Sequence, residues 1–331
     1  MAILVTGGAG YIGSHMVWEL LDAGEDVVVL DRLSTGFEWA VAPEAKLVRG
    51  DIGDIALVRG LLREHEVDAV IHFAGSIVVP ESVADPLGYY DNNTGKTRAL
   101  LEACVAEGLP HFIFSSTAAV YGGAGAEPVS EEATLSPESP YGLSKLMSEW
   151  MLRDAATAHG FTYTALRYFN VAGADPRGRT GQSTAGATHL IKVASETALG
   201  KRPSLKVFGT DYDTPDGTCL RDYIHVSDLA RAHRLALDRL RRGGPSMVAN
   251  CGYGHGYSVL EVIESVRRVS GQDFKVETEG RRPGDAPAVV ANPARAKQEL
   301  GWVPEHDDLD EIVGHALAWE DKLARKNSAG G

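Results

Sequence analysis

The glycine-rich turn near the N-terminus constrains the fold more than any other segment. The apolar run Ala2–Thr6 is typical of a strand covered on both faces, and a helical pattern over 14–23 follows the turn. Between them, Gly7, Gly10 and Gly13 lack side chains, so backbone amides can approach a pyrophosphate at the helix N-terminus. Strand, glycine turn and helix in this order predict a dinucleotide-binding fold.

The second strand indicates which dinucleotide is bound. It covers Val27–Leu30 and ends at Asp31. A carboxylate at this point can accept hydrogen bonds from the adenosine ribose hydroxyls and would repel a 2′-phosphate. Arg32 weakens this preference a little, because an arginine could pair with that phosphate. We therefore expect NAD rather than NADP.

Strands and helices continue to alternate as far as residue 170. The pattern predicts strands over 46–49, 69–73, 112–117 and 163–168, and helices over 55–64, 91–107 and 141–160. This alternation is typical of an α/β fold with a doubly wound parallel sheet of the Rossmann type.

A glycine-rich, polar segment over 174–186 marks the expected domain boundary. We assign 1–170 to the dinucleotide-binding domain and 171–331 to a smaller C-terminal α/β substrate domain, to which a capped amphipathic helix over 258–270 belongs. The segment about 221–252 is expected to return to the first domain. The tail from Lys326 is expected to be frayed.

The candidate catalytic residues are a tyrosine and a lysine at the start of a helix. Tyr141 and Lys145 are four residues apart, so they share one helix face. A free phenol has a pKa of ~10, and lowering it by ~3 units requires ~4 kcal/mol. One cation at ~4 Å supplies about that much at an effective dielectric of ~20. A lysine ammonium and a cationic nicotinamide ring are therefore expected to make Tyr141 a base.

A hydroxyl group ends the fifth strand. Ligands of open parallel sheets bind beyond the carboxyl ends of the strands, so Thr117 is placed to bond a substrate oxygen. The alternative is a threonine that only satisfies nearby backbone groups.

Composition excludes several classes of function. The formal net charge of −13 argues against a nucleic-acid surface, which needs a basic face. No apolar run approaches the ~20 residues that span a bilayer. The three cysteines are scattered and show no metal-ligand spacing, so we predict a reduced, cytoplasmic location and no metal.

Several longer motifs together resemble the nucleotide-sugar epimerases of the extended short-chain dehydrogenase/reductase superfamily. They are the N-terminal glycine turn, 112–122, 139–146, 166–170 and 221–226, and the resemblance extends from Ala2 to about Trp319. It implies NAD-dependent 4-epimerisation of a UDP-hexose between UDP-glucose and UDP-galactose, through a 4-keto intermediate. A homodimer is implied as well.

The resemblance also implies residue roles. Tyr141 is implied as the base, Lys145 as its electrostatic partner and Thr117 as the hydroxyl that shares the substrate proton. The implied cofactor contacts, besides the glycines of the turn and the catalytic pair, are Tyr11, Ile12, Asp31, Asp51, Ile52, Phe73, Ala74, Gly75, Asn92 and Phe169. The implied substrate contacts, besides Thr117, are Asn170, His189, Leu190, Lys206, Val207, Phe208, Arg221, Arg282, Asp285 and Val289.

Some positions depart from the family pattern. Ile77 stands where many members have a cofactor-binding lysine, and His189 replaces a frequent asparagine. Val289 stands where some epimerases have a tyrosine beside the sugar ring. The smaller side chain predicts room for an N-acetyl group, as in UDP-GlcNAc and UDP-GalNAc.

Other functions stay open from the sequence alone. A 4,6-dehydratase would need an acid and a base after Thr117, where Ala118 and Ala119 follow instead. A UDP-pentose 4-epimerase and a non-catalytic NAD-binding sensor are the remaining alternatives. Arg221 and Arg282 suit a diphosphate, because a guanidinium can bond phosphate oxygens bidentately, but structural ion pairs would explain them equally well.

Overall fold

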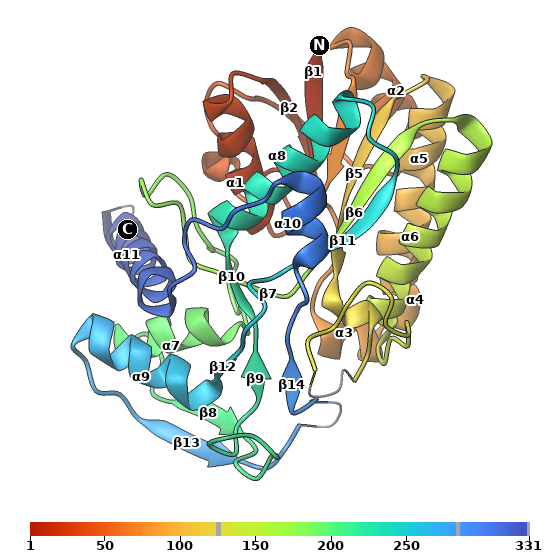
Figure 1. The fold of residues 1–331 in the computed structure, drawn as a ribbon. Helices are drawn as coiled ribbons and strands as arrows, with labels where there is room; N and C mark the ends of the chain where they lie inside the picture. The colour runs from red at the N-terminus through yellow and green to blue at the C-terminus, as the bar shows by residue number, and fades with distance from the viewer. Residues whose placement is uncertain (124–126, 283–284, 330–331) are drawn as a thin grey trace.

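The larger part of the molecule is built on a seven-stranded parallel sheet (Figure 1). The computed structural model describes residues 1–123, 127–282 and 285–329. The strand order is β11-β6-β5-β4-β1-β2-β3, and every neighbouring pair is parallel. The strands are β1 (Ala2–Thr6), β2 (Asp26–Asp31), β3 (Lys46–Arg49), β4 (Ala69–His72), β5 (His111–Thr117), β6 (Thr162–Tyr168) and β11 (Met247–Cys251). The predicted doubly wound sheet is confirmed, with β11 added at its edge.

Helices cover both faces of this sheet. Alternate β1 residues belong to different cores: Ile3 packs with α1 (Tyr11–Asp22) and α8 (Val226–Arg241), whereas Leu4 faces the opposite layer. That layer contains α2 (Ile55–Glu64), α5 (Lys96–Ala106) and α6 (Pro140–His159). Burial of the strands on both faces explains why their sequences are almost continuously apolar.

The helix that was predicted from Asp91 has an unexpected first turn. Residues Tyr90–Gly95 form a π-helical turn, and α5 begins only after it. Two short helices, α3 (Val79–Ala84) and α4 (Pro86–Tyr89), lead into this turn, and the 3-10 turns are Glu38–Ala40 and Ala118–Val120. A π-turn widens the helix locally and is frequent at functional sites.

The C-terminal region contains short sheets and a group of helices. β7 (Asn170–Ala172) pairs with β10 (Tyr223–His225), and β8 (Leu205–Phe208) pairs with β13 (Val276–Glu279). A third sheet has the order β12 (Tyr257–Ser258), β9 (Leu220–Arg221), β14 (Ala288–Val289). The helices are α7 (Leu190–Ala198), α9 (Val259–Ser270), α10 (Ala294–Leu300) and α11 (Leu309–Ala329).

Helix α9 confirms the predicted capped amphipathic helix. Ser258 accepts a hydrogen bond from the Glu261 amide at 3.0 Å, and the Glu261 carboxylate accepts one from the Ser258 amide at 2.7 Å. This reciprocal capping box satisfies two backbone donors that the helix itself leaves free. Gly271 then ends the helix in the left-handed conformation.

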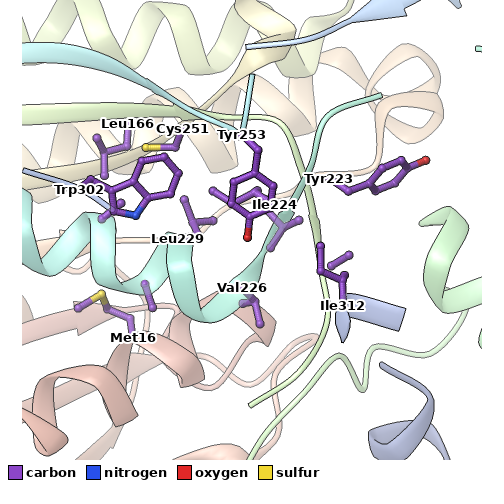
Figure 2. Packing of buried hydrophobic residues seen from close by; sticks show 14 of the residues in the cluster. Met16, Leu166, Tyr223, Ile224, Val226, Leu229, Cys251, Tyr253, Trp302 and Ile312 are labelled. Atoms are coloured by element: carbon purple, nitrogen blue, oxygen red, sulfur yellow. The ribbon is translucent and has the colours of Figure 1, made fainter. Parts of the chain in front are cut away.

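Helix α8 packs against segments from the N-terminal and the C-terminal parts of the sequence. Figure 2 shows Leu229 of α8 near Trp302, Cys251 and Leu166, with Met16 of α1 on its other side. The Trp302 indole donates to the Asp228 carbonyl at 3.0 Å, so the buried ring keeps its hydrogen bond. Residues from five segments of the chain therefore share one core.

The C-terminal helix is longer than expected. Helix α11 continues to Ala329, so the expected frayed tail from Lys326 is wrong as far as Ala329, and 330–331 lie outside the described residues. Across the described residues, no helix combines the length and apolarity that crossing a membrane requires.

Candidate active site

The glycine turn forms a tight cradle between β1, β4 and α1. Gly7 has φ +73°, and a Cβ there would lie 2.6 Å from the Ala74 amide nitrogen. Gly10 is the N-cap of α1 without a side-chain cap, and the first turn of α1 has no acidic residue. The first amides of α1 are therefore free to bind a phosphate group, and the cradle fits a dinucleotide pyrophosphate.

Adding one methyl group to this turn is expected to damage both cofactor binding and stability. In Gly13→Ala, the new Cβ would lie 2.1 Å from the Gly7 carbonyl oxygen, so the turn must move. We expect NAD affinity to fall at least about tenfold and the protein to lose about 1–3 kcal/mol, as overpacked sites do. NAD titration and thermal unfolding measure the two effects.

Gly60→Ala is the matched control for this change. Gly60 lies inside α2, and a Cβ there would have no neighbour within 4 Å. Alanine is the better helix former, so we expect a gain of up to about 1 kcal/mol and unchanged NAD affinity. Equal NAD affinity in Gly13→Ala and the wild type would show that the turn does not hold the dinucleotide.

Asp31 braces the glycine turn from the end of β2. Its carboxylate accepts hydrogen bonds from the Ala9 amide at 3.0 Å and the Leu33 amide at 2.7 Å. Each oxygen keeps capacity for a further bond, so Asp31 can serve the turn and a ribose together. The guanidinium of Arg32 lies 3.7 Å from Asp51, which also binds Lys96 at 2.6 Å.

Tyr141 and Thr117 meet at the carboxyl edge of the sheet. Thr117 is the last residue of β5, and Tyr141 lies in the first turn of α6, where Ser139 caps the helix. The Thr117 hydroxyl lies close enough to the Tyr141 phenol to influence its pKa, and it accepts from the Ala119 amide at 3.2 Å. The backbone contact of Thr117 is therefore present, and its catalytic role stays a prediction.

The protein groups around Tyr141 oppose the ionisation of its phenol, so the predicted basicity of Tyr141 depends on the charge of a nicotinamide ring. Burial raises the pKa of the Tyr141 phenol above its ordinary value, and the nearby Tyr168 and Tyr89 add to the rise. The Thr117 hydrogen bond opposes it. Removal of water disfavours a phenolate more than these neighbours favour it.

Lys145 lies buried beneath the same edge. Its ammonium donates to the Ser115 carbonyl at 3.0 Å and lies 4.9 Å from the centre of the Phe114 ring. Burial lowers the pKa of Lys145 to about 8, while Glu149 one turn further along α6 opposes the shift. Lys145 can therefore carry its charge at neutral pH.

The π-helical turn positions a residue that the sequence analysis missed. The Asn93 amide group accepts from the Ser76 amide at 2.7 Å and donates to the Ser76 carbonyl at 2.9 Å and to Ser144 at 3.0 Å. A Cβ on Gly75 would lie 3.1 Å from Asn93 and 3.7 Å from Lys145. Asn93 thus connects the segment after β4 to α6. The only sequence signal for this role was the position of Asn93 next to the predicted cofactor residue Asn92.

The remaining predicted cofactor residues follow the same edge of the sheet. Asn92 donates to the Ser76 hydroxyl at 2.9 Å, and the Tyr11 hydroxyl donates to the Gly173 carbonyl at 2.7 Å. Ile12, Ile52, Phe73, Ala74 and Phe169 lie in α1 or directly after β3, β4 and β6. Ile77, which stands where a lysine is frequent, is 50% exposed.

The predicted substrate residues fall into two groups. Asn170 of β7 lines one pocket with His189 and Leu190 at the start of α7, and burial lowers the pKa of His189. Gln182 and Tyr223 line the same pocket, although the sequence analysis did not select them. Gln182 lies 2.8 Å from the His189 ring, which fixes that ring at the pocket.

The second group lies around β8, β9 and β14. Val289 is the register partner of Arg221, and the Arg282 guanidinium lies 3.6 Å from the centre of the Phe208 ring. Arg221 donates to the carbonyls of Leu220 and Ala286 and lies 3.5 Å from Asp285. Among the described residues, the ionic contact of the Arg221 guanidinium is thus the long one with Asp285.

Two predicted substrate residues are poorly placed to offer side chains. Lys206 binds Glu279 at 2.9 Å on the surface, and the Val207 side chain is buried in the hydrophobic core. Side chains alternate along β8, and the Val207 side chain is on the face that packs in the core. Only the backbone of Val207 therefore remains available to a ligand.

The sheet, the glycine cradle and the Thr-Tyr-Lys arrangement together define a dinucleotide-dependent enzyme of the extended short-chain dehydrogenase/reductase class. The family model described as "NAD dependent epimerase/dehydratase family" matches residues 3–252. The chain belongs to this family.

Individual relatives are similar over nearly the whole chain. The UDP-glucose 4-epimerase of Azospirillum brasilense is 59% identical over 321 residues, which cover 97% of this chain and 92% of that protein. The structure of UDP-glucose 4-epimerase from Brucella ovis in complex with NAD is 46% identical, with a TM-score of 0.93 over 96% of this chain and 97% of that one. The UDP-Glc/GlcNAc 4-epimerase of Campylobacter jejuni is 48% identical, with a TM-score of 0.85 over 97% and 99%.

Proposed function

We propose that this chain is an NAD-dependent 4-epimerase of UDP-hexoses that interconverts UDP-glucose and UDP-galactose through a 4-keto intermediate. The observation that carries the proposal is the meeting of Thr117 and Tyr141 at the carboxyl edge of the sheet, above the buried Lys145. The relatives named above carry the same activity in their names.

Each catalytic side chain either transfers a proton or contributes a charge. Tyr141 accepts the proton of the C4 hydroxyl, and Thr117 relays or orients that proton through its hydroxyl. Lys145 contributes a positive charge at neutral pH and is fixed by the Ser115 carbonyl. Because burial opposes the phenolate, the protein's charges alone do not make Tyr141 a base at neutral pH.

The dinucleotide is proposed to be held by the glycine cradle, Asp31, Asp51 and the edge residues after β4 and β6. When bound, NAD supplies the acceptor for the C4 hydride, and its oxidised ring adds the positive charge that the phenolate needs. Asn93 and Lys145 keep that edge rigid through their hydrogen bonds.

The nucleoside diphosphate is proposed to be the fixed end of the substrate. Asn170, His189 and Leu190 form one side of its site, and Arg221 and Arg282 supply the positive charge. Binding energy at this remote end orients the sugar without fixing its face, so the ring can present either side of C4. We propose a division into dinucleotide-binding and substrate domains, supported by this separation of the two sets of residues.

A single incubation tests the proposed reaction. Purified protein with UDP-galactose, without added NAD, is followed by proton NMR of the anomeric signals. We expect conversion to an equilibrium mixture with UDP-glucose, because the site holds its dinucleotide between turnovers. No conversion with or without added NAD would overturn the proposed function.

A second substrate is favoured by one residue. Val289 presents a small side chain beside Arg221 and packs in a cluster with Phe169 and Leu146 of α6. A small residue leaves room next to the sugar site, and the relative from Campylobacter jejuni is named for both Glc and GlcNAc. UDP-GalNAc and a UDP-pentose are therefore further arms of the same NMR assay. Absence of UDP-GalNAc turnover would limit the proposal to UDP-glucose and UDP-galactose.

We also propose a homodimer. Val83 of α3, Leu87 of α4 and Trp150 of α6 are 63%, 78% and 43% exposed, and α3 and α4 both pack against α6. Large exposed apolar side chains that gather on one side are typical of an interface. Light scattering is expected to give twice the chain mass of 35.4 kDa, and a monomer at micromolar concentration would contradict this.

A cytoplasmic location is supported by the three free, buried cysteines.

A further inference from the structure

Two histidines and a glutamate converge where α11 begins. His306 precedes the helix, and Glu311 and His315 lie within it; each offers a ligand atom, and the three atoms lie within 4.8 Å of one another. We propose that these side chains bind one divalent transition-metal ion of the Zn²⁺ type, which clamps the start of α11 to the preceding loop. The sequence analysis selected no metal ligand in this chain.

The local structure holds these ligands in place without an ion. Glu311 and His315 are four residues apart, so they share one face of α11. The Asp308 carboxylate accepts from the Glu311 amide at 2.8 Å and fixes the first turn, and the His306 ring bonds the Glu311 carboxylate at 2.7 Å. Ligands that are already ordered lose little entropy when a metal binds.

The donor set selects the class of metal. Two imidazoles and one carboxylate suit zinc, cobalt or nickel, whereas magnesium and calcium prefer oxygen ligands. Three protein ligands leave a fourth position for water in a tetrahedral site. The Glu311 carboxylate neutralises one of the two positive charges of the ion.

His225 supports the site from behind. Its Nε2 lies 3.0 Å from Nδ1 of His315, and its Nδ1 accepts from the Ser227 amide at 3.1 Å. Metal-bound histidines use their second nitrogen in such a contact, so we infer that His315 binds through Nε2. With His315 bound through Nε2, its Nδ1 carries the proton and donates it to Nε2 of His225. Nδ1 of His225 is then protonated and no longer accepts from the Ser227 amide. One capping bond of α8 is a small loss beside three bonds to a metal.

The cluster is accessible from the surface, because the side chains of His306 and Glu311 are 19% and 38% exposed.

The proposed ion is structural and separate from the catalytic residues. His225 begins α8 on one face of the seven-stranded sheet, whereas Tyr141 and Lys145 lie in α6 on the other. Loss of the ion is therefore expected to act first on stability. The inference does not depend on the proposed reaction.

Calorimetric titration of the untagged full chain with Zn²⁺ tests this proposal. We expect one ion per chain with micromolar or tighter affinity, and a higher melting temperature with Zn²⁺ present. His306→Gln and Glu311→Gln should each weaken binding at least about tenfold, because each removes a ligand. Co²⁺ should give visible absorption bands of a four- or five-coordinate site, which both variants should lose.

His255→Gln is the matched control, because His255 is an exposed histidine that binds Asp307 at 2.8 Å beside the same loop. It should bind Zn²⁺ like the wild type. The proposal is overturned if the wild type binds no ion below millimolar concentration, or if His306→Gln and Glu311→Gln bind as the wild type does. Circular dichroism establishes that each variant is folded, and either variant alone suffices for the decision.

Discussion

Tyr141→Phe is expected to lower kcat for UDP-galactose by about 10²–10⁴-fold, the usual contribution of a positioned general base. The change removes one oxygen from a buried ring and leaves the packing in place, so the fold and NAD content should be unaltered. The assay is the initial rate of UDP-glucose formation at saturating substrate. KM should change little, because the nucleoside diphosphate binds elsewhere.

Tyr163→Phe is the matched control for this loss. Tyr163 is a buried tyrosine of β6 that lies outside the candidate site, and the same atom is removed. It should keep nearly full activity. If Tyr141→Phe retained more than about a tenth of the wild-type kcat, Tyr141 would not be the base.

Lys145→Met is the second change with a large expected effect, and its effects on activity and stability have opposite signs. Loss of the buried charge should lower kcat by about 10²–10³-fold, as the loss of one stabilising donor does. The dinucleotide-free protein should become more stable at pH 7, because a buried ammonium is costly. Functional sites commonly carry such a cost in stability.

The sign of the pH dependence follows from the pKa of Lys145. Burial lowers it from 10.5 in the unfolded chain to about 8 in the folded protein. Between these values the unfolded chain binds the extra proton, so wild-type stability rises with pH over this window. Below pH 8 both states are protonated and the full cost of about 3 kcal/mol remains, offset in part by the bond to Ser115.

The stability gain of Lys145→Met should therefore be about 1–3 kcal/mol at pH 7 and should vanish as the pH approaches 10.5. Urea unfolding at several pH values measures it. Lys46→Met, which removes an exposed lysine paired with Glu64, is the control and should change stability by less than about 1 kcal/mol. A variant that is less stable than the wild type at pH 7 would contradict the assignment of a costly buried charge.

The sequence predicts the sheet well because burial leaves a direct signature in it. Strands covered on both faces must be apolar throughout, and Ala2–Thr6 has the predicted bounds. The segment about 221–252 was expected to return to the first domain, but β11 (Met247–Cys251) within it was not predicted as a strand. Its place in the sheet depends on β6, which lies about 80 residues earlier.

The positions of the candidate site residues are predictable where a short sequence motif contains them. The glycine cradle, Thr117, Tyr141 and Lys145 lie as their positions in the motifs indicate. The shift of the Tyr141 pKa was not predictable, because it depends on burial by segments that are distant in sequence. The same applies to Asn93 and to the histidine cluster, whose partners come together only through the tertiary fold.

The central claim is that Tyr141 becomes a base only when the bound dinucleotide adds its charge. Difference absorbance of the phenolate near 295 nm, wild type minus Tyr141→Phe, measures this ionisation as a function of pH with NAD bound. The account predicts that Tyr141 ionises below about pH 8 in this form, well below the ordinary value of ~10. A phenol that stays protonated above pH 10 with NAD bound would contradict it.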